Sequence, residues 1–204
     1  MVKTKYMYAK LVDFVRNEVD SKKIIAIDGR CGSGKSTFGL ELAQALDANL
    51  IRMDDFFLQQ YQRTEERYAT PGENVDHERV KDVLLLWQQH KPFSYKKLDC
   101  KTFTLKEDVI FSEVKDRLVV EGTYSFHKDL IDFYDYKIFF TIDSEAQLER
   151  IKKRNGIEGS QAFKDKWIPL EELYFSSKDP AKYADIIYDS EKGTLKEKKK
   201  WQKQ

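Results

Sequence analysis

Short apolar runs alternate along most of the chain with segments whose apolar residues recur at helical spacing. Five of the runs are rich in β-branched and aromatic residues and show no polar alternation, which is typical of strands buried on both faces of a parallel sheet. These predicted strands are Lys23–Asp28, Asn49–Met53, Arg117–Gly122, Lys137–Asp143 and Ala184–Asp189.

Helical periodicity fills the intervals between these runs. The predicted helices are Val2–Val19, Ser36–Leu46, His77–Gln89, His127–Phe133 and Ala146–Arg154. Strands that alternate with helices predict an α/β fold, here a five-stranded parallel sheet with helices on both faces.

One segment, Phe93–Val114, breaks this rhythm. Phe93 and Tyr95, and then Phe103 and Leu105, recur at period two without any helical signal. This pattern predicts a β-hairpin excursion over one end of the sheet.

The composition narrows the class of protein. A chain of 204 residues is best interpreted as a single domain, residues 1–204, that ends in a charged tail from about residue 190 to 204. Lys and Arg total 36 against 35 Asp and Glu, so the balanced charge predicts no nucleic-acid or membrane partner. Cys31 and Cys100 cannot form a disulfide framework, and no run resembles a signal peptide or spanning helix. We therefore expect a cytoplasmic protein with a small-molecule partner.

The stretch GRCGSGKST follows the first predicted strand and precedes a predicted helix. Gly29, four residues, then Gly34-Lys35-Ser36 is the spacing of a P-loop, in which backbone N–H groups turn inward toward phosphates. In that context Lys35 reaches the β- and γ-phosphates of ATP, and the Ser36 hydroxyl binds Mg²⁺. The predicted nucleotide-binding residues are Gly29, Arg30, Cys31, Gly32, Ser33, Gly34, Lys35, Ser36 and Thr37.

Carboxylates close two of the predicted strands at the edge where open α/β sheets bind ligands. Asp54 and Asp55 follow Asn49–Met53, and Glu121 ends its own run. One carboxylate near Mg²⁺ and a second at an acceptor hydroxyl would suit phosphoryl transfer to an alcohol. For Asp55 a turn or capping role is equally consistent with the pattern. The three histidines, His77, His90 and His127, have no metal-type spacing and predict no metal site.

Several motifs occur in the order and spacing of a known family. GRCGSGKST, MDDFF, NVDHERV, VVEGTY, KIFFTIDSEAQLERIKKR and KYADIIYD resemble the uridine kinase-like branch of P-loop kinases, which includes phosphoribulokinase-type and pantothenate kinase-type enzymes. The resemblance covers residues 24–189. It implies an ATP- and Mg²⁺-dependent phosphotransferase acting on a uridine- or cytidine-like nucleoside, and a homo-oligomer is an open alternative to a monomer.

The resemblance also implies roles for individual residues. Asp54 matches the carboxylate that accepts the proton of the attacking hydroxyl, and Glu121 matches the acidic residue near Mg²⁺. Asp76 matches the carboxylate that grips the sugar hydroxyls, although it could equally cap the following helix. Tyr95 matches an aromatic residue beside the nucleoside base, with simple hairpin packing as the alternative.

A lid is implied over about residues 150–170. Arg150 and Arg154 lie at i, i+4 on a predicted helix and match basic residues that close over the transferred phosphate, while a solvated basic face is the alternative. With Lys35 and Asp54, Arg154 completes the predicted catalytic set, and Arg150 joins the substrate-binding set.

The chain departs from the family pattern on the acceptor side. Val75 stands where an aromatic precedes the sugar-binding aspartate, and Asp99 and Cys100 stand where a base-reading histidine falls. These changes do not affect the predicted ATP-binding residues, but they leave the identity of the acceptor undetermined. A pantothenate-like or sugar kinase is therefore an alternative, and a nucleotide-dependent regulator using the basic tail is another.

Overall fold

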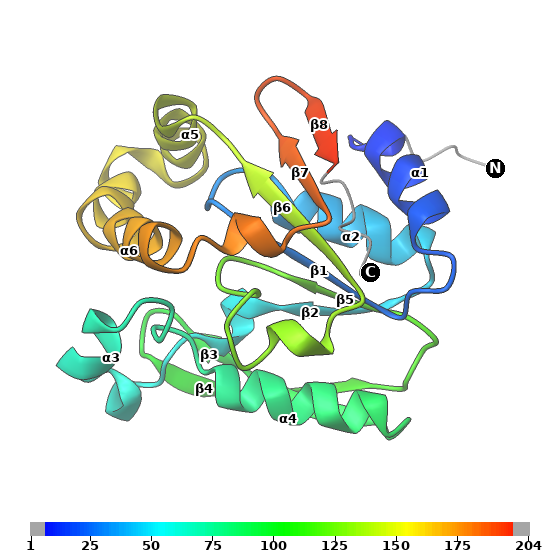
Figure 1. Cartoon of the computed structure of the whole chain (residues 1–204). Coiled ribbons are helices and arrows are strands. Elements are labelled where there is room, and N and C mark those ends of the chain that lie inside the picture. The colour runs from blue at the N-terminus through cyan, green and yellow to red at the C-terminus, as the bar shows by residue number, and fades with distance from the viewer. Residues whose placement is uncertain (1–6, 198–204) are drawn as a thin grey trace.

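The computed structural model describes residues 7–197 and is built around a six-stranded sheet with the order β2-β5-β1-β6-β7-β8 (Figure 1). Its members are β1 (Ile24–Gly29), β2 (Asn49–Arg52), β5 (Leu118–Glu121), β6 (Tyr136–Thr141), β7 (Ile186–Asp189) and β8 (Thr194–Glu197). The first five pair in parallel, whereas β8 runs antiparallel to β7. The predicted α/β fold with five parallel strands is confirmed.

The edge strand β8 corrects one expectation. The predicted charged tail includes residues 194–197, which instead pair with β7 because the chain turns back directly after it. Asp189 accepts N–H bonds from Glu191 and Lys192, and Gly193 takes the positive φ of 63° that completes the turn. Residues 198–204 lie outside the described part of the chain.

Helices cover both faces of the sheet, as predicted. The helices α1 (Ala9–Glu18) and α2 (Lys35–Ala45) pack against one face through Ile25 and Ile27, and α4 (His77–Gln88) lies over the other, where Ile24 and Ala26 point. Adjacent strand residues point to opposite faces, so a strand buried on both sides must be apolar throughout. The part of the Val2–Val19 prediction at residues 2–6 lies outside the described residues.

The predicted helix at His127–Phe133 is wrong. That segment forms only a short 3-10 turn, Ile131–Phe133. His127 and Leu130 donate backbone bonds to residues three positions earlier, Tyr124 and His127, and Tyr124 has a positive φ of 74°. These tight turns and the positive φ of Tyr124 take the place of helical hydrogen bonds at the start of the segment, so no regular helix forms there.

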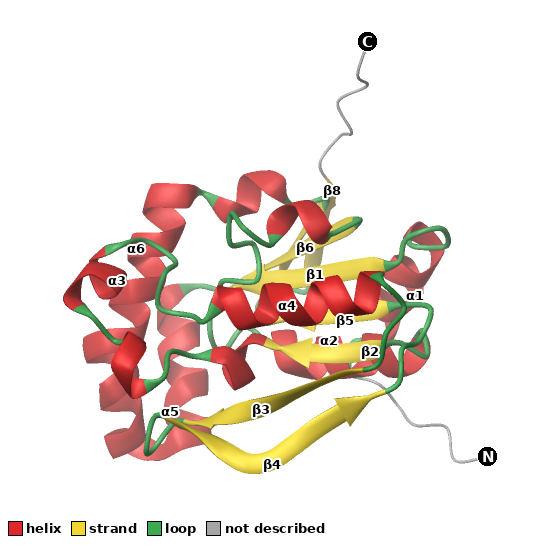
Figure 2. Ribbon diagram, turned by 90° about the horizontal axis from the view of Figure 1, so that it is seen from below, coloured by secondary structure: helices red, strands yellow, loops and turns green. Residues whose placement is uncertain are grey.

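The hairpin excursion is confirmed. The strands β3 (Phe93–Asp99) and β4 (Thr104–Ser112) form a separate two-stranded antiparallel sheet alongside β2 and α4 (Figure 2). Phe93 and Leu98 are buried and hold the hairpin against the body of the protein.

The remaining helices gather beyond the carboxyl ends of the parallel strands (Figure 1). They are α3 (Glu65–Ala69), α5 (Ser144–Ala162), a π-helical turn at Phe163–Trp167 and α6 (Ile168–Lys178). Shorter 3-10 turns lie at Met53–Phe56, Gln60–Gln62 and Pro180–Tyr183. At Gly156 the dihedrals φ 75° and ψ 175° kink α5, so the predicted lid region is helical with one break.

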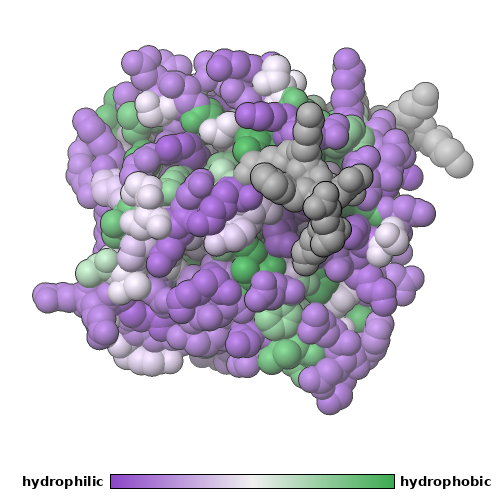
Figure 3. Space-filling view, in the orientation of Figure 1, coloured by the Kyte–Doolittle hydropathy of each residue, from purple (hydrophilic) through white to green (hydrophobic). Residues whose placement is uncertain are grey.

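The face drawn in Figure 3 is mostly hydrophilic, with hydrophobic side chains scattered over it rather than joined into one surface. Within residues 7–197 no helix combines the length and apolar character needed to cross a bilayer.

Candidate active site

The P-loop lies between β1 and α2, where its glycines are required by the backbone. Gly29 has φ 135°, and a Cβ there would collide with the carbonyl oxygen of Phe140 on the neighbouring strand β6. Gly34 has φ 99° and immediately precedes α2. Positive φ values and close backbone approach are the two situations that favour glycine. The loop therefore has the strand–turn–helix setting that the sequence predicted.

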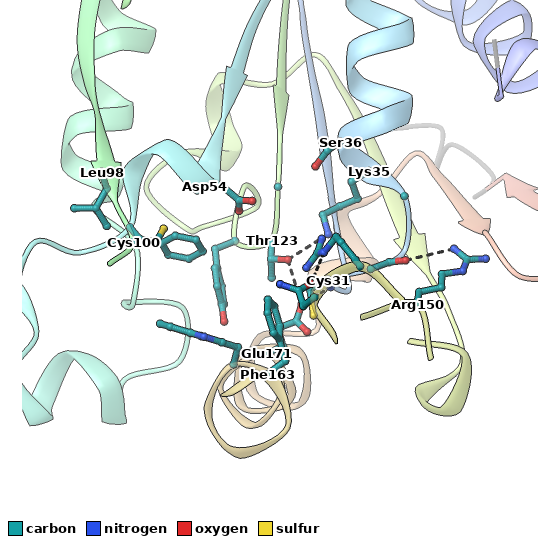
Figure 4. A pocket seen from close by; sticks show the side chains of 18 of the residues that line it. Cys31, Lys35, Ser36, Asp54, Leu98, Cys100, Thr123, Arg150, Phe163 and Glu171 are labelled. Carbon is teal, nitrogen blue, oxygen red and sulfur yellow. Dashed lines mark hydrogen bonds between the residues drawn. The ribbon is translucent and has the colours of Figure 1, made fainter. Parts of the chain in front are cut away.

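Lys35 folds back over the loop. Its Nζ donates to the carbonyl oxygens of Gly29 and Arg30, both at 2.8 Å, and to Thr123 Oγ1 at 3.2 Å (Figure 4). The side chain is only 6% exposed. These partners are neutral, so an anion that enters the loop can compete with them for the ammonium group.

Ser36 and Glu121 meet although they are far apart in the sequence. Ser36 Oγ donates to Glu121 Oε2 at 3.0 Å, and the Glu121 side chain is almost fully buried. Burial, and next the nearby charge of Asp54, raise the pKa of Glu121 to about 7. A hydroxyl with carboxylate oxygens is the hard donor set that Mg²⁺ prefers, and a buried carboxylate of raised pKa is stabilised by a cation. Ser36 and Glu121, which the sequence predicted to lie near Mg²⁺, are chemically suited to bind this ion.

A cavity of about 540 Å³ opens in front of the P-loop. Asp54, in the 3-10 turn that follows β2, lines it together with Lys35 and Ser36 (Figure 4). Because Asp54 is exposed to the cavity, its carboxylate is free to meet a ligand. The fold thus brings the predicted base to the same space as the phosphate loop.

Two arginines of α5 line the same cavity but have different surroundings. Arg150 donates to Ser190 O at 3.0 Å and Ser190 Oγ at 3.2 Å, and its guanidinium also approaches the P-loop carbonyl of Gly32 at 3.4 Å. Among the residues described, Arg154 hydrogen-bonds only to its neighbour Asn155, and its guanidinium lies over the ring of Phe163 at 5.4 Å. Arg150 therefore braces the loop, whereas Arg154 is available to a ligand.

Asp76 and Tyr95 are not among the cavity-lining residues. Asp76 caps α4 by accepting from the backbone N–H of Arg79, and Oδ2 also accepts from Gln62 and the Arg79 side chain at 3.0 Å. Tyr95 packs against Phe56 and donates to Asp55 at 3.4 Å. Asp76 therefore has the helix-capping role, and Tyr95 the hairpin-packing role, that the sequence analysis gave as the alternative to substrate binding.

Glu171 is a site residue that sequence reasoning missed. From α6 it reaches the P-loop, where it accepts the Cys31 backbone N–H at 2.5 Å, the Thr123 hydroxyl at 3.2 Å and the Gln147 amide at 3.0 Å. The neighbouring Glu172 pairs with Arg30. In the sequence, the only sign of a role for Glu171 is an acidic residue among apolar ones. That sign does not reveal that its partner lies 140 positions away.

Aromatic side chains form part of the cavity wall. Phe57, Phe103, Phe163 and Trp167 line the cavity there, and Arg63 stacks over Phe103 at 3.6 Å. None of these residues was predicted to line the site, and Phe103 entered the sequence analysis only as part of the period-two pattern of the hairpin. These rings offer flat apolar surface, with Arg63 over Phe103 and Arg154 over Phe163.

Cys31 lines the cavity but is not activated. Burial, followed by the charge of Glu171, raises the pKa of its thiol to about 12. A thiol of such high pKa stays protonated, so it is no nucleophile at neutral pH. Its backbone N–H donates to Glu171 and is therefore not free to bind a phosphate.

The comparisons with known proteins agree with this geometry. A family model described as an AAA domain matches residues 25–166. A uridine kinase from Clostridium tetani is 29% identical over 181 residues, which cover 80% of this chain and 85% of that protein. A possible uridine kinase from Bacillus stearothermophilus superposes with a TM-score of 0.65 at 21% identity, covering 89% of this chain and 98% of that one. A D-glycerate 3-kinase from Cryptococcus neoformans superposes with a TM-score of 0.64 at 12% identity, covering 95% and 100%. The chain belongs to the AAA domain family that this model describes, and its similarities support a uridine kinase-like P-loop kinase.

Proposed function

We propose that the protein transfers the γ-phosphoryl group of ATP to a hydroxyl of a nucleoside of the uridine or cytidine type. The observation that carries this proposal is that Lys35, Ser36 and Asp54 line one cavity, with Glu121 bonded to Ser36 beneath it. A phosphate loop, a metal-binding pair and a separate exposed carboxylate are the parts that phosphoryl transfer to an alcohol requires.

Each residue of the site has its own part in the transfer. Lys35 exchanges its carbonyl contacts for the β- and γ-phosphate oxygens and offsets their charge. Ser36 and Glu121 hold Mg²⁺, which supplies further positive charge to the phosphates when bound. Asp54 orients the acceptor hydroxyl and takes its proton as the new O–P bond forms and the bond to ADP breaks. Arg154 adds charge from the lid side.

The acceptor side supports a planar, hydroxylated substrate. The aromatic wall around Phe57 and Trp167 can stack against a base, and such stacking tolerates different bases. Asp76 holds the ribose diol only if its Oδ2 exchanges Gln62 or Arg79 for substrate hydroxyls. With Val75 and Cys100 at positions that read the base elsewhere in the family, we expect loose base selection.

The test is acceptor-dependent release of ADP, measured across uridine, cytidine, other nucleosides and their 2′-deoxy forms. If Asp76 exchanges Gln62 or Arg79 for the ribose diol, ribonucleosides should react at least about tenfold faster than the deoxy forms, whereas equal rates would show that Asp76 keeps its present partners. Asp54→Asn should depress turnover far more than ATP affinity, while Asp55→Asn, the neighbour turned toward Tyr95 and Lys97, serves as the matched control. ATP turnover that ignores every acceptor would instead indicate a nucleotide-dependent regulator.

One observation favours a second candidate, a kinase for an acidic alcohol of the pantothenate or sugar-acid kind. Arg63 lines the cavity, half-buried, and makes no ion pair with any acidic residue among residues 7–197. A cation in that position suits a carboxylate or phosphate on the acceptor. Glycerate against glycerol and pantothenate against its neutral alcohol are the matched pairs that test it.

A further inference from the structure

Two histidines stack against each other away from the nucleotide cavity. His77 begins α4 and His127 lies in the loop after β5, and their ring centroids are 4.0 Å apart with an interplanar angle of 17°. The sequence spacing of the histidines did not indicate this stack, because the fold joins segments about 50 residues apart. His90, beyond the far end of α4, is exposed.

A carboxylate faces both rings on the same side. Glu73 Oε2 lies 2.9 Å from His77 Nε2, and Glu73 Oε1 lies 3.3 Å from His127 Nε2. The ligand atoms of the three residues all lie within 4.8 Å of one another. In a tetrahedral zinc site with bonds of about 2.0–2.2 Å, neighbouring ligand atoms are about 3.3 Å apart. The carboxylate–imidazole separations already match that spacing.

The other edges of the rings face a second carboxylate. Asp129 Oδ2 lies 3.5 Å from His77 Nδ1 and 3.8 Å from His127 Nδ1. Histidines that bind metals through one nitrogen are commonly oriented by a carboxylate at the other. His127 Nδ1 also accepts the Asp129 backbone N–H at 3.3 Å, so metal binding at its Nε2 requires the ring proton to move to Nδ1 and face Asp129 Oδ2 instead. The side chains of His77 and His127 are 10% and 3% exposed, so water competes weakly with such a ligand set.

We propose that Glu73, His77 and His127 form a binding site for Zn²⁺ or a similar divalent transition metal, with water completing the coordination. Two imidazoles and one carboxylate are a ligand set that zinc accepts, whereas Mg²⁺ prefers oxygen alone. The ion replaces the protons that otherwise join the two Nε2 atoms to Glu73. Its binding needs the rings to tilt apart from their near-parallel stacking, so that both lone pairs converge.

The site has a consequence for the acceptor side of the cavity. Glu73 and His77 flank Asp76, and His127 follows the loop that carries Glu121 and Thr123. A metal ion held by all three ligands therefore ties these two segments together. Metal binding should stabilise the folded protein, because the ligands come together only in the folded chain.

The test uses the full chain, stripped with a chelator and titrated with Co²⁺ as a spectroscopic probe. Excess Mg²⁺ is present so that Co²⁺ is kept from Ser36 and Glu121. We expect one equivalent to give the strong visible bands of four-coordinate Co²⁺, one equivalent of Zn²⁺ to displace it, and Zn²⁺ to raise the melting temperature.

Three variants locate the binding. His127→Asn and Glu73→Gln should weaken Co²⁺ binding at least about tenfold and abolish the thermal shift. Glu73→Gln keeps an oxygen to accept a hydrogen bond, so it remains informative if His127→Asn folds poorly. His90→Ala removes an exposed histidine and should bind Co²⁺ like the wild type. Absence of stoichiometric binding to the folded wild type, or unchanged binding in Glu73→Gln, overturns the proposal.

Discussion

Lys35 of the P-loop is buried and makes three hydrogen bonds, unlike a lysine on an exposed loop. Lys35→Ala removes three hydrogen bonds but orphans no carbonyl, since Gly29 O also accepts from Thr123 and Arg30 O from the Ser33 N–H. We expect the variant to fold, as judged by circular dichroism, with turnover reduced at least about 100-fold because charge stabilisation at the phosphates is lost. Near-normal acceptor-dependent turnover in the folded variant would contradict the P-loop assignment.

The two lid arginines should separate into a structural and a catalytic residue. Arg150→Ala removes bonds that join α5 to Ser190 and to the P-loop, so its main effect should be a lower melting temperature and weaker ATP binding. Arg154→Ala breaks only a local contact and should lower kcat with little change in melting temperature.

Each arginine variant is the other's control in parallel unfolding and steady-state kinetic measurements. The reverse pattern, with kcat lost in Arg150→Ala and stability lost in Arg154→Ala, would exchange the two roles.

Among the elements, the kinked helix α5 holds the best-defined hinge. Gly156 has φ 75°, and a Cβ at this position would meet no other atom within 4 Å, so an alanine there is disfavoured by the backbone alone. Gly156→Ala should shift the lid toward a straighter helix and change kcat and KM together. Glu158→Ala, an exposed position two residues along the same helix, is the matched control and should be close to neutral, whereas a Cβ at Gly159 would lie 3.0 Å from the Asn155 Cβ.

Limited proteolysis reports on the lid directly. We expect cleavage after Lys164 and Lys166 to slow when nucleotide and acceptor are both present, because the lid then closes on the ligands. Equal cleavage with and without ligands, in the wild type and in Gly156→Ala alike, would argue against a hinge at this position.

Elements that carry their own periodicity or motif spacing in the sequence were predictable, whereas elements that form through contacts with distant parts of the chain were not. The parallel strands, α2, α4 and the hairpin each carry their own periodicity, and the P-loop carries fixed spacing. The edge strand β8 was missed because its polar residues become a strand only beside β7. Glu171 and the His77–His127 stack were missed for the same reason, since their partners lie about 50 to 140 residues away.

The stability of the whole molecule should depend on pH through its buried carboxyls. The pKa of Glu121 is raised to about 7 by burial and by Asp54, and that of Asp28 to about 6 by burial. Between the ordinary carboxyl range and these values the folded state binds more protons than the unfolded state, so these groups make stability fall as pH rises. His127 has the opposite effect on the pH dependence. Burial lowers its pKa to about 4, so its contribution makes the stability rise with pH up to about 6.5, the ordinary pKa of histidine.

A comparison with Glu121→Gln isolates one of these contributions. Glutamine retains the oxygen that accepts from Ser36 but cannot ionise, and the contributions of Asp28 and His127 are common to both proteins. Without Mg²⁺, the variant should become more stable relative to wild type as pH rises from about 5 to 8. The gain is on the order of 3 kcal/mol at most, since one pKa unit corresponds to about 1.4 kcal/mol. Urea unfolding at several pH values measures it, and a stability difference that does not change with pH would show that Glu121 ionises normally. Adding Mg²⁺ with ATP should reverse the trend for the wild type, because the cation favours the charged carboxylate that the variant lacks.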